Sequence, residues 1–195
     1  MLERGMVLGG LLGAALVCGR PLQAQVQLTG FVGLYAPIDT KGIELLDRDA
    51  HRRGDFAYGG RLTVWASKSF GIEALGGFSR ARITRTTNAG RLPRSTNVGF
   101  GAGKLMLNLT PKRKYSFVIG GGVSGLHIAK TVIDPNQSET KFGGIGGIGL
   151  RLPFGENVAL RGDIEDFIYH ADFGRGAKLT NDLLLSGGLS ISFGR

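Results

Sequence analysis

The chain contains eight segments in which apolar residues alternate, one position in two, with small or polar residues. This period of two is typical of a β-strand with one apolar face. Most of the segments are eleven or twelve residues long. Strands in ordinary globular domains average about five or six residues, whereas a tilted strand that crosses a bilayer needs ~9–11. The predicted strands cover residues 26–37, 56–66, 70–80, 98–109, 115–129, 142–152, 158–169 and 182–193.

In most segments one row is apolar and the other is not. In 182–193 the apolar row includes Leu185 and Leu189, and the residues between are mainly serine and glycine. The segment 98–109 differs, because its apolar row changes phase near Gly103. A phase change inside a strand is the expected mark of a β-bulge, so the sequence predicts a bulge there.

The connections between the predicted strands alternate between short and long. An even number of antiparallel strands with short turns at one end and long loops at the other is typical of a transmembrane β-barrel. Both termini and the short turns would then face the periplasm, and the long loops would face the cell exterior. The short connections are 67–69, 110–114 and 153–157, and the long ones are 38–55, 81–97, 130–141 and 170–181.

Glycine excludes the main helical alternatives. The chain has 34 glycines in 195 residues, and many lie inside apolar runs, where each would destabilise a helix by roughly 1 kcal/mol. Such a composition argues against an all-α protein and against a Rossmann-like α/β protein. The interior of an eight-stranded barrel is only just wide enough for side chains to fill. We therefore expect glycine and serine to occupy many inward positions.

A soluble eight-stranded barrel such as a lipocalin is the main rival. Its outer row would carry many charged residues, but the non-apolar row here is mostly glycine, serine and threonine. Aromatic residues also gather near the strand ends, as in the two aromatic girdles of membrane barrels. The predicted girdles are Phe56, Tyr58, Phe78, Phe142, Phe167 and Tyr169 on the loop side, and Phe70, Tyr115, Phe117 and Phe193 on the turn side.

The N-terminal segment 1–24 is predicted to be a cleaved signal peptide. Arg4 precedes thirteen uncharged residues, 6–18, and Ala24 provides a small residue at the expected cleavage point. The uncharged run is too short for a transmembrane helix, which needs ~20 residues. The domain organisation that follows is a signal peptide at 1–24 and one barrel domain at 25–195.

The last predicted strand carries a recognisable terminal pattern. Ser186, Gly188, Ile191 and Phe193 fit the order polar, glycine, apolar, aromatic. This order resembles the signal by which outer-membrane barrels are delivered to the barrel assembly machinery, although Gly194 and an arginine follow the aromatic residue. Together with the topology, it makes residues 26–193 similar to the small OmpA- and OmpX-like outer-membrane β-barrel domains. The resemblance implies an eight-stranded antiparallel up-and-down transmembrane barrel in the outer membrane of a Gram-negative bacterium.

Charged residues on the non-apolar rows are candidates for a network inside the barrel. If those rows face inward, opposite charges must pair, because an unpaired buried charge is costly. The expected role is a plug that closes the lumen, and the alternative is a gated pore of small conductance. The candidates are Arg61, Glu73, Lys104, Arg151, Arg161, Asp163 and Glu165.

The loop 81–97 and its edge carry a second charged group, which has five arginines and no acidic residue. Either this is a solvated basic loop, or it contacts an anionic polymer at the cell surface. The most plausible polymer is lipopolysaccharide, because arginine matches phosphate groups bidentately. The five residues are Arg80, Arg82, Arg85, Arg91 and Arg94.

Other chemistries find little support in the sequence. Two GxGxxG matches, 120–125 and 144–149, precede no helix and therefore do not predict a nucleotide site. Three histidines and a single cysteine, which lies in the predicted signal peptide, give no metal-ligand spacing. His127 and His170 have no nucleophile at the spacing used by the outer-membrane lipid A deacylase. We expect no enzymatic activity, no cofactor and no nucleic-acid partner.

The function predicted from the sequence is therefore a structural or surface-binding role in the outer membrane. The expected partners are outer-membrane lipid, lipopolysaccharide and the barrel assembly machinery, and the protein is expected to be monomeric. One alternative is a narrow OmpW-like transporter of small or hydrophobic solutes, which would have an opening lined by apolar inward residues. A second alternative is a surface adhesin that acts through its long loops.

Overall fold

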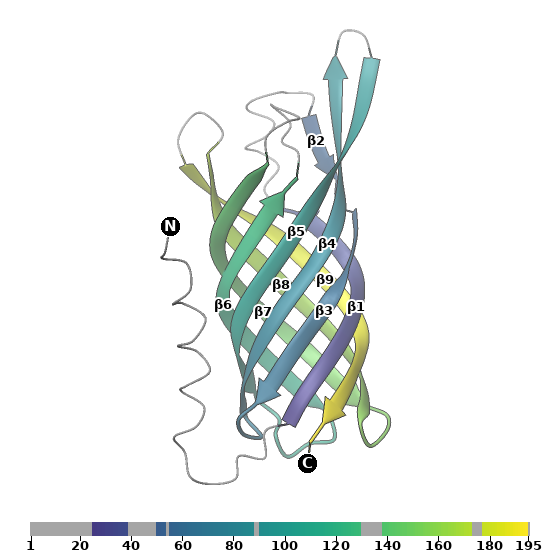
Figure 1. The fold of residues 1–195 in the computed structure, drawn as a ribbon, viewed down its shortest axis with the longest axis vertical. Helices are drawn as coiled ribbons and strands as arrows, with labels where there is room; N and C mark the ends of the chain where they lie inside the picture. The colour runs from purple at the N-terminus through teal and green to yellow at the C-terminus, as the bar shows by residue number, and fades with distance from the viewer. Residues whose placement is uncertain are drawn as a thin grey trace, which may run out of the picture.

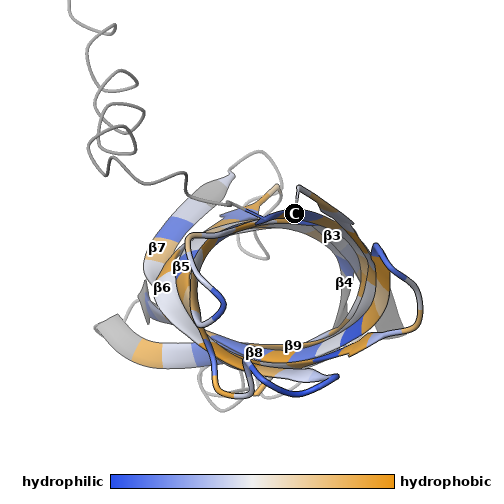
Figure 2. Ribbon diagram, turned by 90° about the horizontal axis from the view of Figure 1, so that it is seen from below, coloured by the Kyte–Doolittle hydropathy of each residue, from blue (hydrophilic) through white to orange (hydrophobic). Residues whose placement is uncertain are grey.

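The computed structural model describes residues 25–38, 50–53, 55–87, 90–129, 138–172 and 177–194. The predicted signal peptide lies outside these ranges and stays a prediction. Among the described residues, no helix is long and apolar enough to span a membrane. Eight long antiparallel strands close into a barrel (Figures 1 and 2). They are β1 (Gln25–Pro37), β3 (Asp55–Trp65), β4 (Phe70–Thr87), β5 (Gly90–Asn108), β6 (Ser116–Ile128), β7 (Glu139–Pro153), β8 (Val158–Asp172) and β9 (Ala177–Phe193).

The barrel has the predicted up-and-down topology. Each long strand pairs with its neighbours in the sequence, and β1 closes the ring by pairing with β9 from Val26↔Phe193 to Pro37↔Asp182. The short connections lie at the end of the barrel that holds the C-terminus, at the bottom of Figure 1, which we call the turn side. The opposite end is the loop side.

All four regions predicted as long loops contain strand residues, which in 130–141 and 170–181 are extensions of β7, β8 and β9. A short strand, β2 (Ala50–Arg53), pairs with β4 within the first long connection. In addition, β4 and β5 continue in register above the barrel as far as Thr87↔Gly90, so most of the predicted loop 81–97 is a two-stranded ribbon (Figure 1). The prediction failed because this ribbon has no apolar face, and the period of hydrophobicity is the signal by which a strand is recognised.

The bulge predicted near Gly103 is absent. The pairing of β5 with β4 and with β6 runs without a break through this residue. The inward row of β5 is apolar at Val98 and Phe100 and becomes charged at Lys104, while its outward row is apolar at Leu105. The apparent phase change arises because the inward row is apolar at the loop-side end of the strand and charged in its middle.

The outer wall is apolar, and its alternation follows the predicted rows. Arg61 is 2% exposed, whereas its neighbour Leu62 is 46% exposed. The girdle prediction was wrong for Phe167 and Tyr169, which are buried inside the barrel. Exposed aromatic residues remain near both ends: Phe56, Tyr58, Phe78 and Phe142 on the loop side, and Phe70, Tyr115 and Phe193 on the turn side.

The interior is arranged in three levels. A buried apolar cluster fills the loop side, and Tyr35 stacks on Phe100 there with ring centroids 5.5 Å apart. Charged side chains fill the middle. Trp65, Met106 and Val118 form a small apolar cluster at the turn side.

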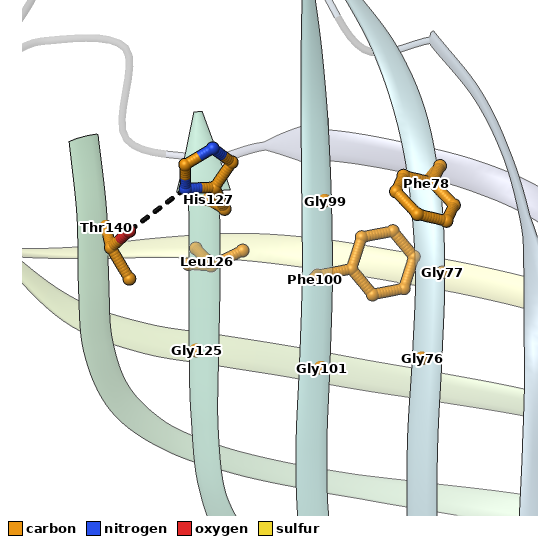
Figure 3. Close-up of a pocket in the computed structure, with 10 residues that line it drawn as sticks. All are labelled: Gly76, Gly77, Phe78, Gly99, Phe100, Gly101, Gly125, Leu126, His127 and Thr140. Atoms are coloured by element: carbon orange, nitrogen blue, oxygen red, sulfur yellow. Dashed lines mark hydrogen bonds between the residues drawn. The ribbon is translucent and has the colours of Figure 1, made fainter. Parts of the chain in front are cut away.

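The inward glycines make room for neighbouring atoms. At each inward-row strand glycine that the structure describes, an added Cβ would come within 3.0 Å of another atom. Five of these glycines lie directly opposite an aromatic residue on a neighbouring strand: Gly59 and Gly188 opposite Phe31, Gly71 opposite Trp65, Gly77 opposite Phe100, and Gly143 opposite Tyr169. Figure 3 shows the Phe100 ring beside Gly77, where a Cβ would lie 2.6 Å from the ring. Glycine and aromatic residues thus fill the narrow interior together.

The outward glycines need a different explanation. At none of the outward-row strand glycines described would a Cβ meet another atom closer than 3.5 Å. The steric limits of the interior therefore account for only part of the glycine content. Five outward glycines form a continuous cross-strand row over β1, β3, β4, β5 and β6: Gly30, Gly60, Gly76, Gly101 and Gly125.

Two alanine substitutions on β1 test this division. In Gly33→Ala the new Cβ would overlap the Leu185 carbonyl oxygen and lie 2.8 Å from the Ser186 Cα. We expect a loss of about 1–3 kcal/mol in the free energy of unfolding, as in other overpacked sites. Gly30→Ala, whose Cβ meets nothing within 4 Å, should change it by less than about 0.5 kcal/mol or stabilise slightly. Urea unfolding in lipid vesicles measures both, and equal losses would contradict the division.

Candidate functional site

Six of the seven charges predicted for the lumen meet in the middle of the barrel. Arg61 lies on β3, Glu73 on β4 and Lys104 on β5, and the other three lie on β8. In the order of strands around the ring, β4 and β8 are four strands apart in both directions, so they stand on opposite walls. Each of the six is at most 5% exposed: Arg61, Glu73, Lys104, Arg161, Asp163 and Glu165.

Glu73 is the centre of the pairing. One carboxylate oxygen lies 2.8 Å from Lys104 Nζ and 3.7 Å from Arg61 Nε. The other accepts a hydrogen bond of 2.5 Å from Arg161 and one of 2.6 Å from the Thr63 hydroxyl. Because Glu73 and Arg161 project from opposite walls, their ion pair crosses the full width of the lumen.

The remaining two carboxylates bind the same cations from β8. Glu165 accepts a hydrogen bond of 2.6 Å from Arg61 and also pairs with Lys104. Asp163 pairs with Arg161 at 2.9 Å and with Arg61 at 3.3 Å. Three cations and three carboxylates therefore compensate one another.

Uncharged contacts complete the environment of Arg61. Its guanidinium donates a hydrogen bond of 2.9 Å to the Ser186 hydroxyl and lies 4.3 Å from the centre of the Phe31 ring. A cation over an aromatic face is favourable, particularly away from water. These contacts anchor the network to β9 and β1 as well.

Arg151 is not part of this network. It is only half-buried, and it donates a hydrogen bond of 2.9 Å to the Ser192 hydroxyl near the turn side. None of the described carboxylates forms an ion pair with it. The sequence placed Arg151 on the correct row, but position along the strand separates it from the acidic residues.

The sequence reasoning missed a second buried polar group near the loop side. Asp182 is 1% exposed and accepts hydrogen bonds from the Tyr35 hydroxyl at 2.5 Å and the Tyr169 hydroxyl at 2.9 Å. The available signal was that Asp182 shares its row with Ser186.

The five arginines predicted for surface contact lie on the β4–β5 hairpin. Arg80 is exposed just above the apolar wall. Arg82 lies opposite Arg53 of β2, which adds an arginine from another connection. By backbone register, Arg80, Arg82 and Arg91 share one face of the ribbon, and Arg85 and Arg94 share the other.

The predicted assembly signal lies on β9, which closes the barrel against β1. Ser186 is buried on the inward row, which Gly188 shares, and Ile191 and Phe193 are exposed on the outward row. Recognition by the assembly machinery stays a prediction.

His127 lies beside a shallow groove of about 410 Å³ in the outer wall (Figure 3). Its Nδ1 is 3.0 Å from the Thr140 hydroxyl, so a hydroxyl is within reach of a possible base. No carboxylate contacts His127 within the described ranges. His127 and Thr140 thus lack the carboxylate that would orient the histidine in an activated base–nucleophile pair. No group of three or more histidine, cysteine, aspartate or glutamate side chains among the described residues is arranged to hold a metal ion.

Comparison with known proteins identifies the fold. No family model matches the sequence, and no curated protein matches it either. Solved structures do match. The outer membrane protein OprG from Pseudomonas aeruginosa superposes with a TM-score of 0.64 at 13% identity, over 88% of this chain and 97% of that one. The N-terminal β-barrel domain of OprF from the same species gives 0.54 at 12% identity, over 87% and 97%. The outer membrane protein AlkL gives 0.54 at 16% identity, over 91% and 93%.

The chain therefore has the fold of the small eight-stranded outer-membrane β-barrels, as the sequence predicted. The exposed apolar wall is the surface with which such a barrel faces lipid.

A double-mutant cycle tests the central ion pair. Glu73→Gln should lower the free energy of unfolding by about 3–5 kcal/mol, because it leaves Arg161 and Lys104 with too little negative charge in a buried site. Arg161→Gln should have a similar cost. The double variant should lose less than the sum, with a coupling of about 0.5–3 kcal/mol measured by urea unfolding. Additive losses would show that the two groups act independently.

Proposed function

We propose that this protein is an integral outer-membrane barrel with a closed lumen and a structural or surface-binding role. One observation carries the proposal: a compensated cluster of six charges crosses the interior of a barrel whose outer wall is apolar. A soluble barrel would present the reverse arrangement, with charges outside and an apolar interior.

The contacts in the middle of the barrel support a closed lumen. An eight-stranded barrel is just wide enough for its side chains, and here the ion pair between Glu73 and Arg161 spans it. Above this level, Tyr35, Phe100 and Phe167 pack ring against ring. An OmpW-like transporter would need an opening lined by apolar inward residues. The apolar inward residues described on the loop side are instead packed together and almost fully buried.

The hairpin of β4 and β5 supports a surface-binding role. It carries the five arginines beyond the apolar wall, on the side that would face the cell exterior. β2 brings Arg52 and Arg53 into register beside it. Lipopolysaccharide carries phosphate groups in that region, and guanidinium groups bind phosphate strongly. We propose lipopolysaccharide as the partner of this ribbon.

The first experiment tests the closed outer-membrane barrel. Expressed with residues 1–24 in a Gram-negative host, the protein should collect in the outer-membrane fraction and migrate differently on a gel before and after boiling. Reconstituted in planar bilayers, it should leave the conductance at the level of bare lipid, because the lumen is filled.

Two results would contradict this part of the proposal. Recovery in the soluble periplasmic fraction would exclude a membrane barrel. A conductance far above that of bare lipid, and lost in Arg161→Gln, would show that the charge cluster conducts and does not plug the barrel.

The second experiment tests the basic ribbon. Replacing Arg80, Arg82, Arg85, Arg91 and Arg94 together by glutamine should weaken binding to purified lipopolysaccharide at least about tenfold at low salt. The difference should shrink as salt is raised, since exposed charge pairs are screened. The control is the triple glutamine variant of Lys112, Arg113 and Lys114, three exposed cations at the turn side. Unchanged binding in the ribbon variant, or an equal loss in the control, would rule out the ribbon as the site.

A further inference from the structure

A polar cavity of about 290 Å³ opens at the turn-side mouth of the barrel. Strands from much of the ring contribute to its wall, because their turn-side ends converge there. The exposed turn 153–157 adds Glu156, the only acidic residue in the lining. The residues used below are Gln27, Trp65, Lys68, Asn108, Ser116 and Arg151.

Arg151 brings an uncompensated cation to this cavity. Its guanidinium has one hydrogen bond, to Ser192 at 2.9 Å, and its Nε is buried without a partner. The cations of the charge cluster are each paired with carboxylates, and Arg151 has none among the described residues. Directly opposite it in the β7–β8 register stands Arg161, another cation. A guanidinium in this position favours an anion beside it.

Trp65 brings a second unused donor. The indole is only 9% exposed and packs against Met106 and Val118, yet its Nε1 has no hydrogen-bond partner. A buried tryptophan N–H usually finds an acceptor, and leaving it unmatched costs about 1–3 kcal/mol. Trp65 and Arg151 therefore line one cavity and share the same deficiency, which is a lack of acceptors.

The surrounding charge has the same sign. Lys68 lines the cavity, and the neighbouring turn between β5 and β6 exposes Lys112, Arg113 and Lys114. Only Glu156 opposes these cations among the described residues of the three turns. The mouth is thus electropositive, and the amide and hydroxyl groups of Gln27, Asn108 and Ser116 offer further hydrogen bonds to a ligand.

We propose that the turn-side mouth is a binding site for a phosphate group, anchored by the Arg151 guanidinium, with the Trp65 side chain in the same lining. A phosphate supplies several acceptor oxygens, which matches a cavity whose lining carries donors from several strands. Either free inorganic phosphate or the phosphate of a lipid headgroup would satisfy this chemistry. That this mouth faces the periplasm rests on the proposed function, whereas the site itself rests only on its geometry.

Trp65 makes the site directly observable, because it is the only tryptophan in the chain. The protein, labelled with ¹⁵N in its tryptophan and held in uncharged maltoside micelles, should show one indole N–H resonance. Inorganic phosphate should shift this resonance in a saturable way and change the tryptophan fluorescence with the same apparent Kd. Binding should be at least tenfold weaker in Arg151→Gln, and less than twofold weaker in Arg113→Gln, which removes an equal charge from the exposed turn.

A second variant and a lipid arm keep the outcome decisive. Arg151→Lys retains the charge but loses the planar fork, and should bind phosphate with intermediate affinity even if Arg151→Gln folds poorly. A response to free phosphate identifies a site for the soluble ion. A response only in nanodiscs that contain phosphatidylglycerol identifies a headgroup site.

The proposal is overturned if neither probe moves the indole signal of the folded protein. It is also overturned if Arg113→Gln weakens binding as much as the Arg151 variants do, since the effect would then be one of general charge. Failure of this experiment leaves the outer-membrane and lipopolysaccharide tests unaffected, because they use other residues and other readouts.

Discussion

The rest of the structure depends on the need of buried charges for partners. Six ionised side chains lie buried inside the barrel wall. Their ion pairs offset the free-energy cost of removing these charges from water. Each ion pair but one joins different strands, and Glu73 with Arg161 joins opposite walls. A one-residue slip of β8 or β4 would turn these side chains toward the apolar surroundings. The cluster therefore fixes the register of the whole ring.

Glycine provides the volume that this arrangement needs. Large side chains such as Phe31, Trp65 and Phe100 fit inside a narrow barrel because a glycine stands directly across the strand pair from each of them. The outward glycines have no such neighbours and leave the outer wall locally thin. Glycine thus makes room for large side chains inside the barrel, and on the outer face it leaves shallow depressions in the wall.

The sequence predicted the fold and most of the charge cluster because both depend on a period of two. Arg61, Glu73 and Asp163 could be assigned to the lumen from their rows alone. The periodicity carries no information on height, so it could not show that Arg151 lies below the acidic residues or that Tyr169 lies inside near Asp182. It also could not detect the β4–β5 ribbon, where no apolar face exists. Those features follow from closure of the ring and from strand pairing beyond the wall.

The interior is apolar near the loop side and charged in the middle, so the two levels differ in how strongly they determine which strand face points inward. Near the loop side, the wall separates two apolar surroundings: Val98 and Phe100 face in, while Tyr58 and Phe78 face out. Apart from the buried Asp182 group, hydropathy at that level gives little preference for one face over the other. The inward face is determined in the middle of the barrel, where the charges lie. Because β4 and β5 pair without a break, the same rows face inward at the loop side. The charged residues of β3, β4, β5 and β8 thus determine which face of the sheet becomes the interior, and the loop-side wall follows from them.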